Sequence, residues 1–163
     1  MEKVIWSLPT SVDVNGTEYG IRSDYRAVLD ILTALTDNEL DDHLKAEAAL
    51  EIFYPGFDEM PPGDYQEALN QCFRFIDRGQ DRKEKKHEPA LMSWEQDFDI
   101  IIAPINRIAG CEVRALEYLH WYSFLSFSRA TSIPSPHPVP GHLRVSLLRQ
   151  ACAVSLGTSF AFM

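Results

Sequence analysis

Residues 93–127 constrain the fold most strongly, because they hold two apolar helical patterns separated by one glycine. In the first pattern, large apolar side chains recur every three or four residues, at Trp94, Phe98, Ile101, Ile102 and Ile105. This spacing predicts a helix over residues 94–109 with one apolar stripe that packs against another element. A capping box of Ser93 and Gln96 should start the helix, Pro104 should kink it, and Gly110 should end it in the left-handed conformation.

The second pattern predicts a helix over residues 111–127 with an unusually aromatic middle. Two interpretations of this aromatic face stay open: a docking groove for a partner, or part of the core. The candidate partner-binding residues are His120, Trp121, Tyr122, Phe124 and Phe127. His120 itself is either a proton shuttle or a neutral core histidine, bonded to a backbone group or to an acid such as Asp97.

The first half of the chain predicts a β-hairpin followed by three helices. Asn15-Gly16 suits a type I′ turn between alternating runs, so residues 11–21 form the hairpin. Its core face should carry Val12, Val14, Thr17, Tyr19 and Ile21. Residues 4–6 are candidates for a third strand. Apolar spacing then predicts helices over about 24–36, 38–54 and 64–77, the second burying Leu44 and exposing Lys45.

Length and composition favour one soluble domain. The chain has 163 residues, of which 45% are hydrophobic, and this is enough for one core. Together with the helical patterns, it predicts a single mainly α domain over residues 1–127 with the small hairpin and about five helices. A net charge of −9 argues against a nucleic-acid partner. No run approaches the ~18 apolar residues of a membrane helix, and the amino-terminal run is too short for a signal peptide. The chain has three cysteines, an odd number without CxxC spacing, which suits a reducing compartment. We therefore expect a cytoplasmic protein.

Residues 128–163 differ in composition from the rest. No acidic residue follows Glu117, and residues 133–141 alternate proline with other residues, which prevents a regular element. Two explanations stay open. The tail is either translated in a different reading frame from the preceding domain, or it is a genuine proline-rich linker with a short terminal element.

No catalytic, cofactor or metal constellation is found in the sequence. The five histidines form no zinc-ligand spacing, and phosphate loops, nucleophile elbows and dinucleotide fingerprints are missing. We therefore expect no catalytic residue, no cofactor and no metal, and a protein that is not an enzyme.

Three sequence features together resemble one family of small phage proteins. They are an early Leu-Pro and hairpin, the helix entry Ser23-Asp24-Tyr25-Arg26, and a capped acidic run at residues 93–99 joined to the Leu119-His120-Trp121 box. Over about residues 7–125 the chain is similar to gene-product-fifteen-type proteins of long-tailed phages, tail assembly chaperones encoded near the tape-measure gene. After the Leu119-His120-Trp121 box the chain departs from that family.

The resemblance implies a non-enzymatic protein of the host bacterial cytoplasm. Its partners would be the tape-measure protein, whose apolar helices it would cover, and the tail-tube subunits that later enclose them. The aromatic groove would bind amphipathic helix faces. Apart from the resemblance, a homo-oligomer is a further candidate partner state. The alternative is a structural tail or head–tail connector subunit that stays in the virion.

Overall fold

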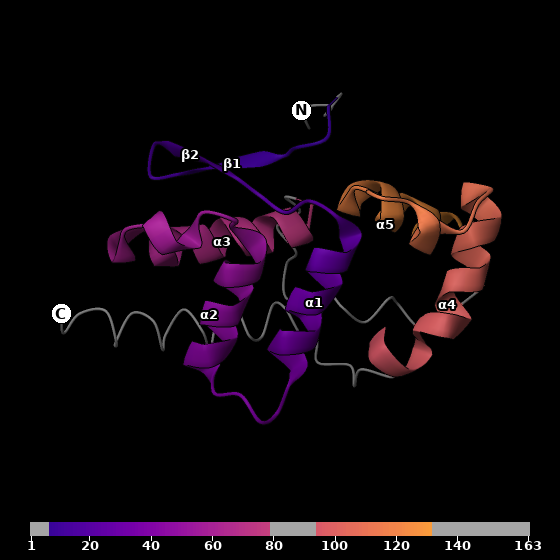
Figure 1. Cartoon of the computed structure of the whole chain (residues 1–163), viewed down its shortest axis with the longest axis horizontal. Coiled ribbons are helices and arrows are strands. Elements are labelled where there is room, and N and C mark those ends of the chain that lie inside the picture. The colour runs from indigo at the N-terminus through magenta and orange to yellow at the C-terminus, as the bar shows by residue number, and fades with distance from the viewer. Residues whose placement is uncertain (1–6, 79–93, 132–163) are drawn as a thin grey trace.

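The computed structural model describes residues 7–78 and 94–131 (Figure 1). Its fold is mainly helical with a small antiparallel hairpin near the amino terminus, which confirms the predicted class. Among the described residues, no helix is long and apolar enough to cross a bilayer. The elements in chain order are β1 (Ser11–Val14), β2 (Thr17–Gly20), α1 (Tyr25–Thr36), α2 (Asp42–Phe53), η1 (Phe57–Glu59), η2 (Pro62–Asp64), α3 (Tyr65–Ile76), α4 (Trp94–Ala109), η3 (Val113–Ala115) and α5 (Trp121–Ala130).

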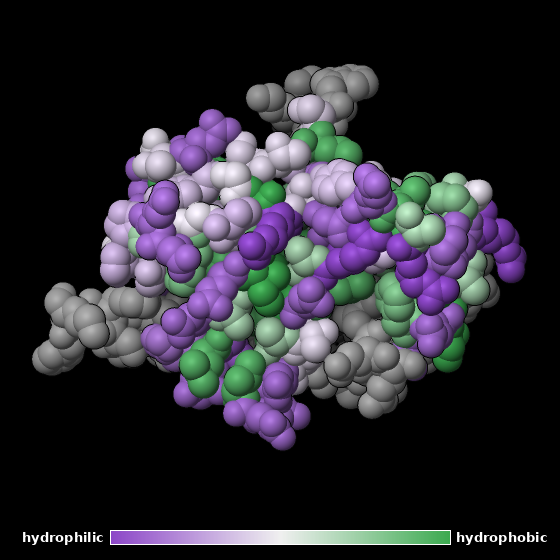
Figure 2. All heavy atoms as spheres, in the orientation of Figure 1, coloured by the Kyte–Doolittle hydropathy of each residue, from purple (hydrophilic) through white to green (hydrophobic). Residues whose placement is uncertain are grey.

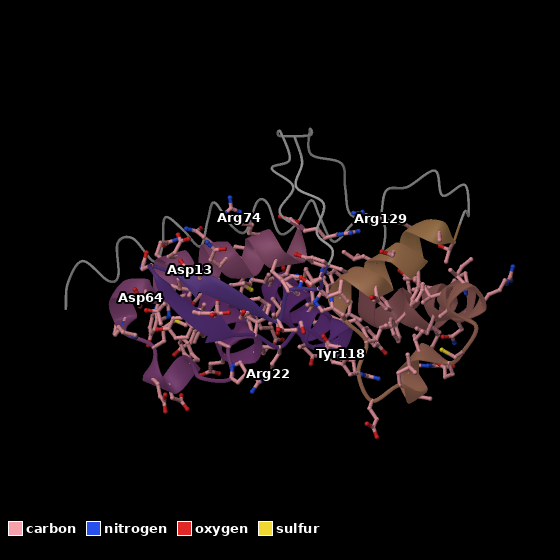
Figure 3. The ribbon with its side chains drawn as sticks, turned by 90° about the horizontal axis from the view of Figure 1, so that it is seen from above. Asp13, Arg22, Asp64, Arg74, Tyr118 and Arg129 are labelled. Carbon is pink, nitrogen blue, oxygen red and sulfur yellow. The ribbon has the colours of Figure 1, made fainter. Side chains whose placement is uncertain are left out.

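The hairpin has the predicted register. Val12 pairs with Tyr19 and Val14 with Thr17, while Asn15 (φ 52°) and Gly16 (φ 88°) make the turn. Val14 is fully buried, and β1 packs on α3. The turn is also held to the helical layer, because the Asn15 side-chain amide donates to the Asp64 carboxylate at 2.7 Å. Figure 3 shows Asp64 near the hairpin residue Asp13. The proposed third strand at residues 4–6 lies outside the described residues.

Helices α1, α2 and α3 build most of the core, but α2 differs from its prediction. It begins at Asp42 rather than at residue 38, because Asp41 occupies the N-cap position and accepts from the Leu44 backbone N–H at 2.8 Å. The buried face also differs. Leu44 is 46% exposed and Lys45 is buried. Leu50 and Phe53 are buried as the apolar spacing predicts, and Ala46 and Ala49 complete the buried face at helical spacing.

The predicted helix over residues 111–127 is wrong in its first half. The chain forms the short η3, an extended segment over residues 116–120, and then α5 from Trp121 to Ala130. The physical reason is a β-bridge between Asp24 and His120, which holds this segment extended against the start of α1. His120 then caps α5, its Nδ1 accepting from the Tyr122 N–H at 3.0 Å.

The predicted helix over residues 94–109 is confirmed as α4, and it includes Pro104. Gly110 follows with φ 72°, which confirms the left-handed stop. The capping box of Ser93 and Gln96 lies outside what the structure describes. In Figure 1, α4 lies at one end of the molecule, against α5 and the edge of α1. Beyond residue 131 the tail is also outside the described residues, so the change of reading frame stays a prediction.

Candidate partner-binding site

Two sequence segments about ninety-five positions apart dock on each other. We call this contact between residues 23–26 and 116–121 the junction. The Asp24 carboxylate accepts from the backbone N–H groups of Arg26 and Leu119, both at 2.9 Å. Backbone bonds run alongside, because Tyr25 N–H donates to the Leu119 carbonyl at 2.9 Å and Trp121 N–H to the Ser23 carbonyl at 2.8 Å. The junction thus joins the Ser23–Arg26 helix entry to the Leu119–Trp121 box.

The Arg26 side chain closes the junction from the other side. Its guanidinium bonds the Asp24 carboxylate at 3.1 Å and donates to the Leu116 carbonyl at 2.6 Å. Ser23 and Tyr118 share a hydrogen bond of 2.7 Å between their hydroxyl groups. These polar side chains at the start of α1 therefore have partners in the extended segment, which explains why a Ser-Asp-aromatic-Arg entry suits this position.

The five predicted partner-binding residues, which we call the aromatic box, belong to the core. His120, Trp121, Tyr122 and Phe124 are buried, and Phe127 is half-buried and packs against them. The Trp121 indole N–H donates to the Ile76 carbonyl at 3.0 Å, and the Phe124 ring stacks on Tyr25 at 4.5 Å between centroids. A partner would touch the four buried side chains only if α5 left its place. Their role in partner binding stays a prediction, and the structure gives them a packing role.

His120 is a neutral core histidine bonded to backbone groups. Its Nδ1 accepts from Tyr122 N–H, so the ring proton is on Nε2, which donates to the Pro9 carbonyl at 2.8 Å. The backbone alternative of the prediction therefore holds, and Asp97 is not the partner of this ring. Both ring nitrogens are occupied by structural bonds.

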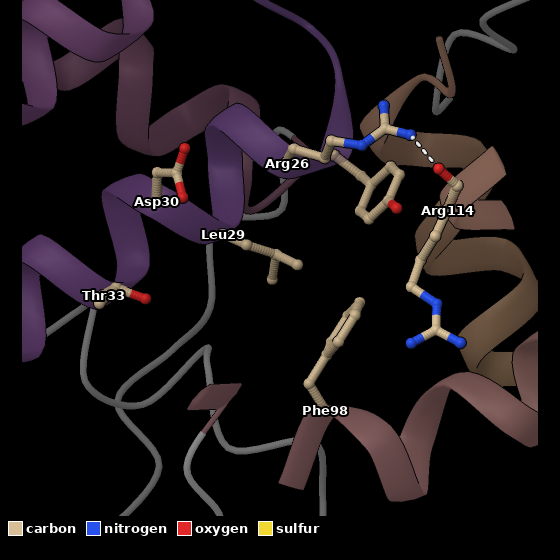
Figure 4. A pocket seen from close by; sticks show the side chains of 7 residues that line it. Arg26, Leu29, Asp30, Thr33, Phe98 and Arg114 are labelled. Carbon is tan, nitrogen blue, oxygen red and sulfur yellow. Dashed lines mark hydrogen bonds between the residues drawn. The ribbon is translucent and has the colours of Figure 1, made fainter. Parts of the chain in front are cut away.

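An open hollow lies beside the junction, between α1, η3 and α4 (Figure 4). Its volume is about 350 Å³. The apolar lining comes from Tyr25, Leu29 and Phe98, and the rim is polar, with Arg26, Asp30, Thr33 and Arg114. Leu29 and Phe98 are only half-buried. Apolar periodicity places both residues on the apolar stripes of their helices, but it gives no sign of a hollow between these helices.

The cations at the rim already have partners. Arg114 donates from Nε to Glu112 at 2.9 Å and lies 3.4 Å from Asp99. Hydrogen bonds from Arg114 lower the pKa of Glu112 to about 2 and raise that of Arg114. Since Arg26 and Arg114 are both neutralised, the hollow carries little free positive charge. Its chemistry suits an apolar side chain with a polar neighbour better than an anion.

The Glu112 carboxyl group should titrate near pH 2, well below the usual ~4.3 for glutamate. Its folded-state pKa is lowered, so its stabilising contribution exists above the usual pKa and disappears as the pH falls toward 2. Carboxyl carbon NMR shifts followed against pH check this value. Replacing Arg114 with Gln should return the Glu112 pKa toward the usual range, whereas a low pKa in that variant would contradict the assigned cause.

A second hollow of about 540 Å³ shares Arg26 and Asp30 with the first. Arg22 and Tyr118 line it, and Figure 3 shows both on one side of the molecule. The Arg22 guanidinium donates hydrogen bonds to the carbonyls of Glu51 and Ile52, at 3.0 and 2.9 Å. Within the described part of the chain, no three His, Cys, Asp or Glu residues are grouped for a metal ion. The lack of enzyme activity stays a prediction.

Comparison with known proteins relates the chain to a phage family. The family model described as "Bacteriophage Gp15 protein" matches residues 5–130. No curated protein and no solved structure matches the chain. The matched range contains both sides of the junction and every described helix and strand, and it ends at Ala130, the last residue of α5. It covers most of the chain, and the chain therefore belongs to the Bacteriophage Gp15 protein family.

Proposed function

We propose that this phage protein is a tail assembly chaperone that binds apolar helices of the tape-measure protein in the host cytoplasm, without enzyme activity. The observation that supports this most directly is the hollow between α1 and α4, where Leu29 and Phe98 stay accessible at the surface. An amphipathic helix recognises such a site by inserting one or two apolar side chains while its polar face stays in water.

The aromatic box packs against one wall of this hollow. Phe124 stacks on Tyr25, and the Tyr25 ring forms one wall of the hollow. We therefore assign the predicted partner-binding residues a positioning role, with contact to the partner made by Leu29 and Phe98. The net charge of −9 favours a soluble complex, because like-charged particles repel each other.

Binding to a helical tape-measure fragment should fall by at least ~10-fold in Leu29→Glu, because a carboxylate in the apolar lining would lose its hydration. Thr33→Arg, at the rim, should also weaken binding by filling the hollow while leaving its apolar lining intact. Titration calorimetry with the purified full chain measures both effects. Leu44→Glu is the matched control, since Leu44 is an exposed leucine on α2 and lies outside the hollow.

Circular dichroism must first show that each variant folds. Unchanged affinity in folded Leu29→Glu and Thr33→Arg would exclude this hollow as the binding site. A structural tail or head–tail connector subunit is the alternative function. Mass spectrometry of purified virions separates the two, because a chaperone is missing from mature particles and a structural subunit is present in fixed stoichiometry.

A further inference from the structure

Helix α4 exposes apolar side chains on the face opposite to the core. Ile102 and Ile105 are buried, whereas Ile100 is 73% exposed and Ile108 is 44% exposed. Ala103 is also exposed and Pro104 is half-buried. Positions 100, 103, 104 and 108 follow helical spacing, so they form one stripe. We call it the outer stripe; Figure 2 shows apolar residues at the surface over this end of the molecule.

The outer stripe is geometrically self-complementary. By helical spacing, Ala103, Pro104, Arg107 and Ile108 surround one point of this face, where a side chain from a facing helix could dock; we call this point the hole. Consider an antiparallel pair in which the two Ala103 residues face each other. Ile100 of one helix then lies roughly 4.5 Å along the helix axis from that crossing point, and the hole of the second helix lies roughly 4 Å from it in the same direction. Ile100 of each copy therefore fits the hole of the other. The small Ala103 at the crossing allows close helix approach.

The charges favour the same arrangement. Asp99 lies four residues before Ala103 and Arg107 four residues after it, so an antiparallel pair brings each Asp99 level with the Arg107 of the second copy. The Asp99 side chain is 90% exposed, so it can reach a second cation besides Arg114 at 3.4 Å, and Arg107 is exposed. A parallel pair would place Asp99 against Asp99. The face thus carries both the apolar and the ionic pattern of a two-fold contact.

We propose that a second copy of this chain docks on the outer stripe, making an antiparallel α4–α4 homodimer. One helix pair buries less than the ~800 Å² per partner of a standard interface, so the dimer should be weak and depend on concentration. Phe98 lies two positions from Ile100, on the other side of α4, where it lines the hollow. The dimer therefore leaves the proposed tape-measure site open and does not depend on it.

Sedimentation equilibrium of the purified full chain over a wide concentration range tests this proposal. We expect a monomer–dimer equilibrium that Ile100→Glu weakens by at least ~10-fold. Asp99→Arg and Arg107→Asp should each weaken it too, and the double variant should restore it, because the two ion pairs are then reversed. Leu44→Glu, at an exposed position of α2, should leave the dimer unchanged.

Three results would overturn the proposal. The first is a monomer at every concentration, and the second is a dimer that Ile100→Glu leaves intact, which places the contact elsewhere. The third is a dimer broken by Ile100→Glu but not restored by the double variant, which rejects the antiparallel register. If the chain is monomeric and Ile100→Glu abolishes binding of the tape-measure fragment, the outer stripe belongs to that partner instead.

Discussion

Replacing Trp121 with Ala should lower the free energy of unfolding by about 3–5 kcal/mol. The side chain is 1% exposed, its ring stacks on Phe124 at 5.8 Å between centroids, and its indole N–H bonds the Ile76 carbonyl. Alanine would leave a cavity between α5 and α3 and an unpaired buried carbonyl. Domains of this size are stable by only about 5–15 kcal/mol, so the loss is a large fraction of the total. Urea denaturation followed by circular dichroism measures it.

Two further variants separate packing from hydrogen bonding at this position. Trp121→Phe keeps much of the apolar contact but loses the indole donor, so we expect a smaller loss of about 1–3 kcal/mol. Tyr118→Ala changes an exposed aromatic three residues earlier and should cost less than Trp121→Ala. A denaturation midpoint equal to wild type in Trp121→Ala would show that the indole contributes no packing, and would revive the interpretation of this face as a docking surface.

The elements that sequence reasoning predicted well are those with local signals. The hairpin register follows from Asn15 and Gly16, which alone determine how the two strands face each other. Likewise, α4 follows from its apolar period and the glycine that ends it. In both cases the information lies within a few residues of the structure it determines.

The failures have two causes. The apolar spacing of residues 111–120 is helical, but residues 116–120 are extended because the hydrogen-bond partners of Leu119, His120 and Trp121 lie near residue 24. The later start of α2 has a more local cause. Asn38 and Asp41 are both suitable N-cap residues, and capping by Asp41 sets the later start. Competing caps a few residues apart have similar sequence signals.

The candidate site could be predicted only in part. Sequence reasoning identified an aromatic box with two possible roles, and the structure places it in the core. It missed the hollow, because Leu29 and Phe98 belong to separate helices that come together only in the folded chain. Periodicity tells which residues are apolar, but the degree to which each is covered depends on how distant elements pack.

Replacing Asp24 with Asn should lower the free energy of unfolding by about 2–3 kcal/mol, because one carboxylate here serves several donors. It accepts from the backbone N–H groups of Arg26 and Leu119 and pairs with the Arg26 guanidinium. An amide has one acceptor oxygen, so its NH₂ group would face a donor and leave a bond unmade. Chemical denaturation measures the overall loss, and amide hydrogen exchange shows where it occurs.

Exchange should increase most at the amides of Leu119 and Trp121, which the junction protects. Asp30→Asn is the matched control, because Asp30 is an exposed aspartate on the same helix and its replacement removes the same charge. If Asp24→Asn and Asp30→Asn reduce stability equally, the effect is one of net charge, and the junction does not depend on the carboxylate. If only Asp24→Asn speeds exchange across residues 116–121, this single side chain keeps the segment extended, and with it sets where α5 begins.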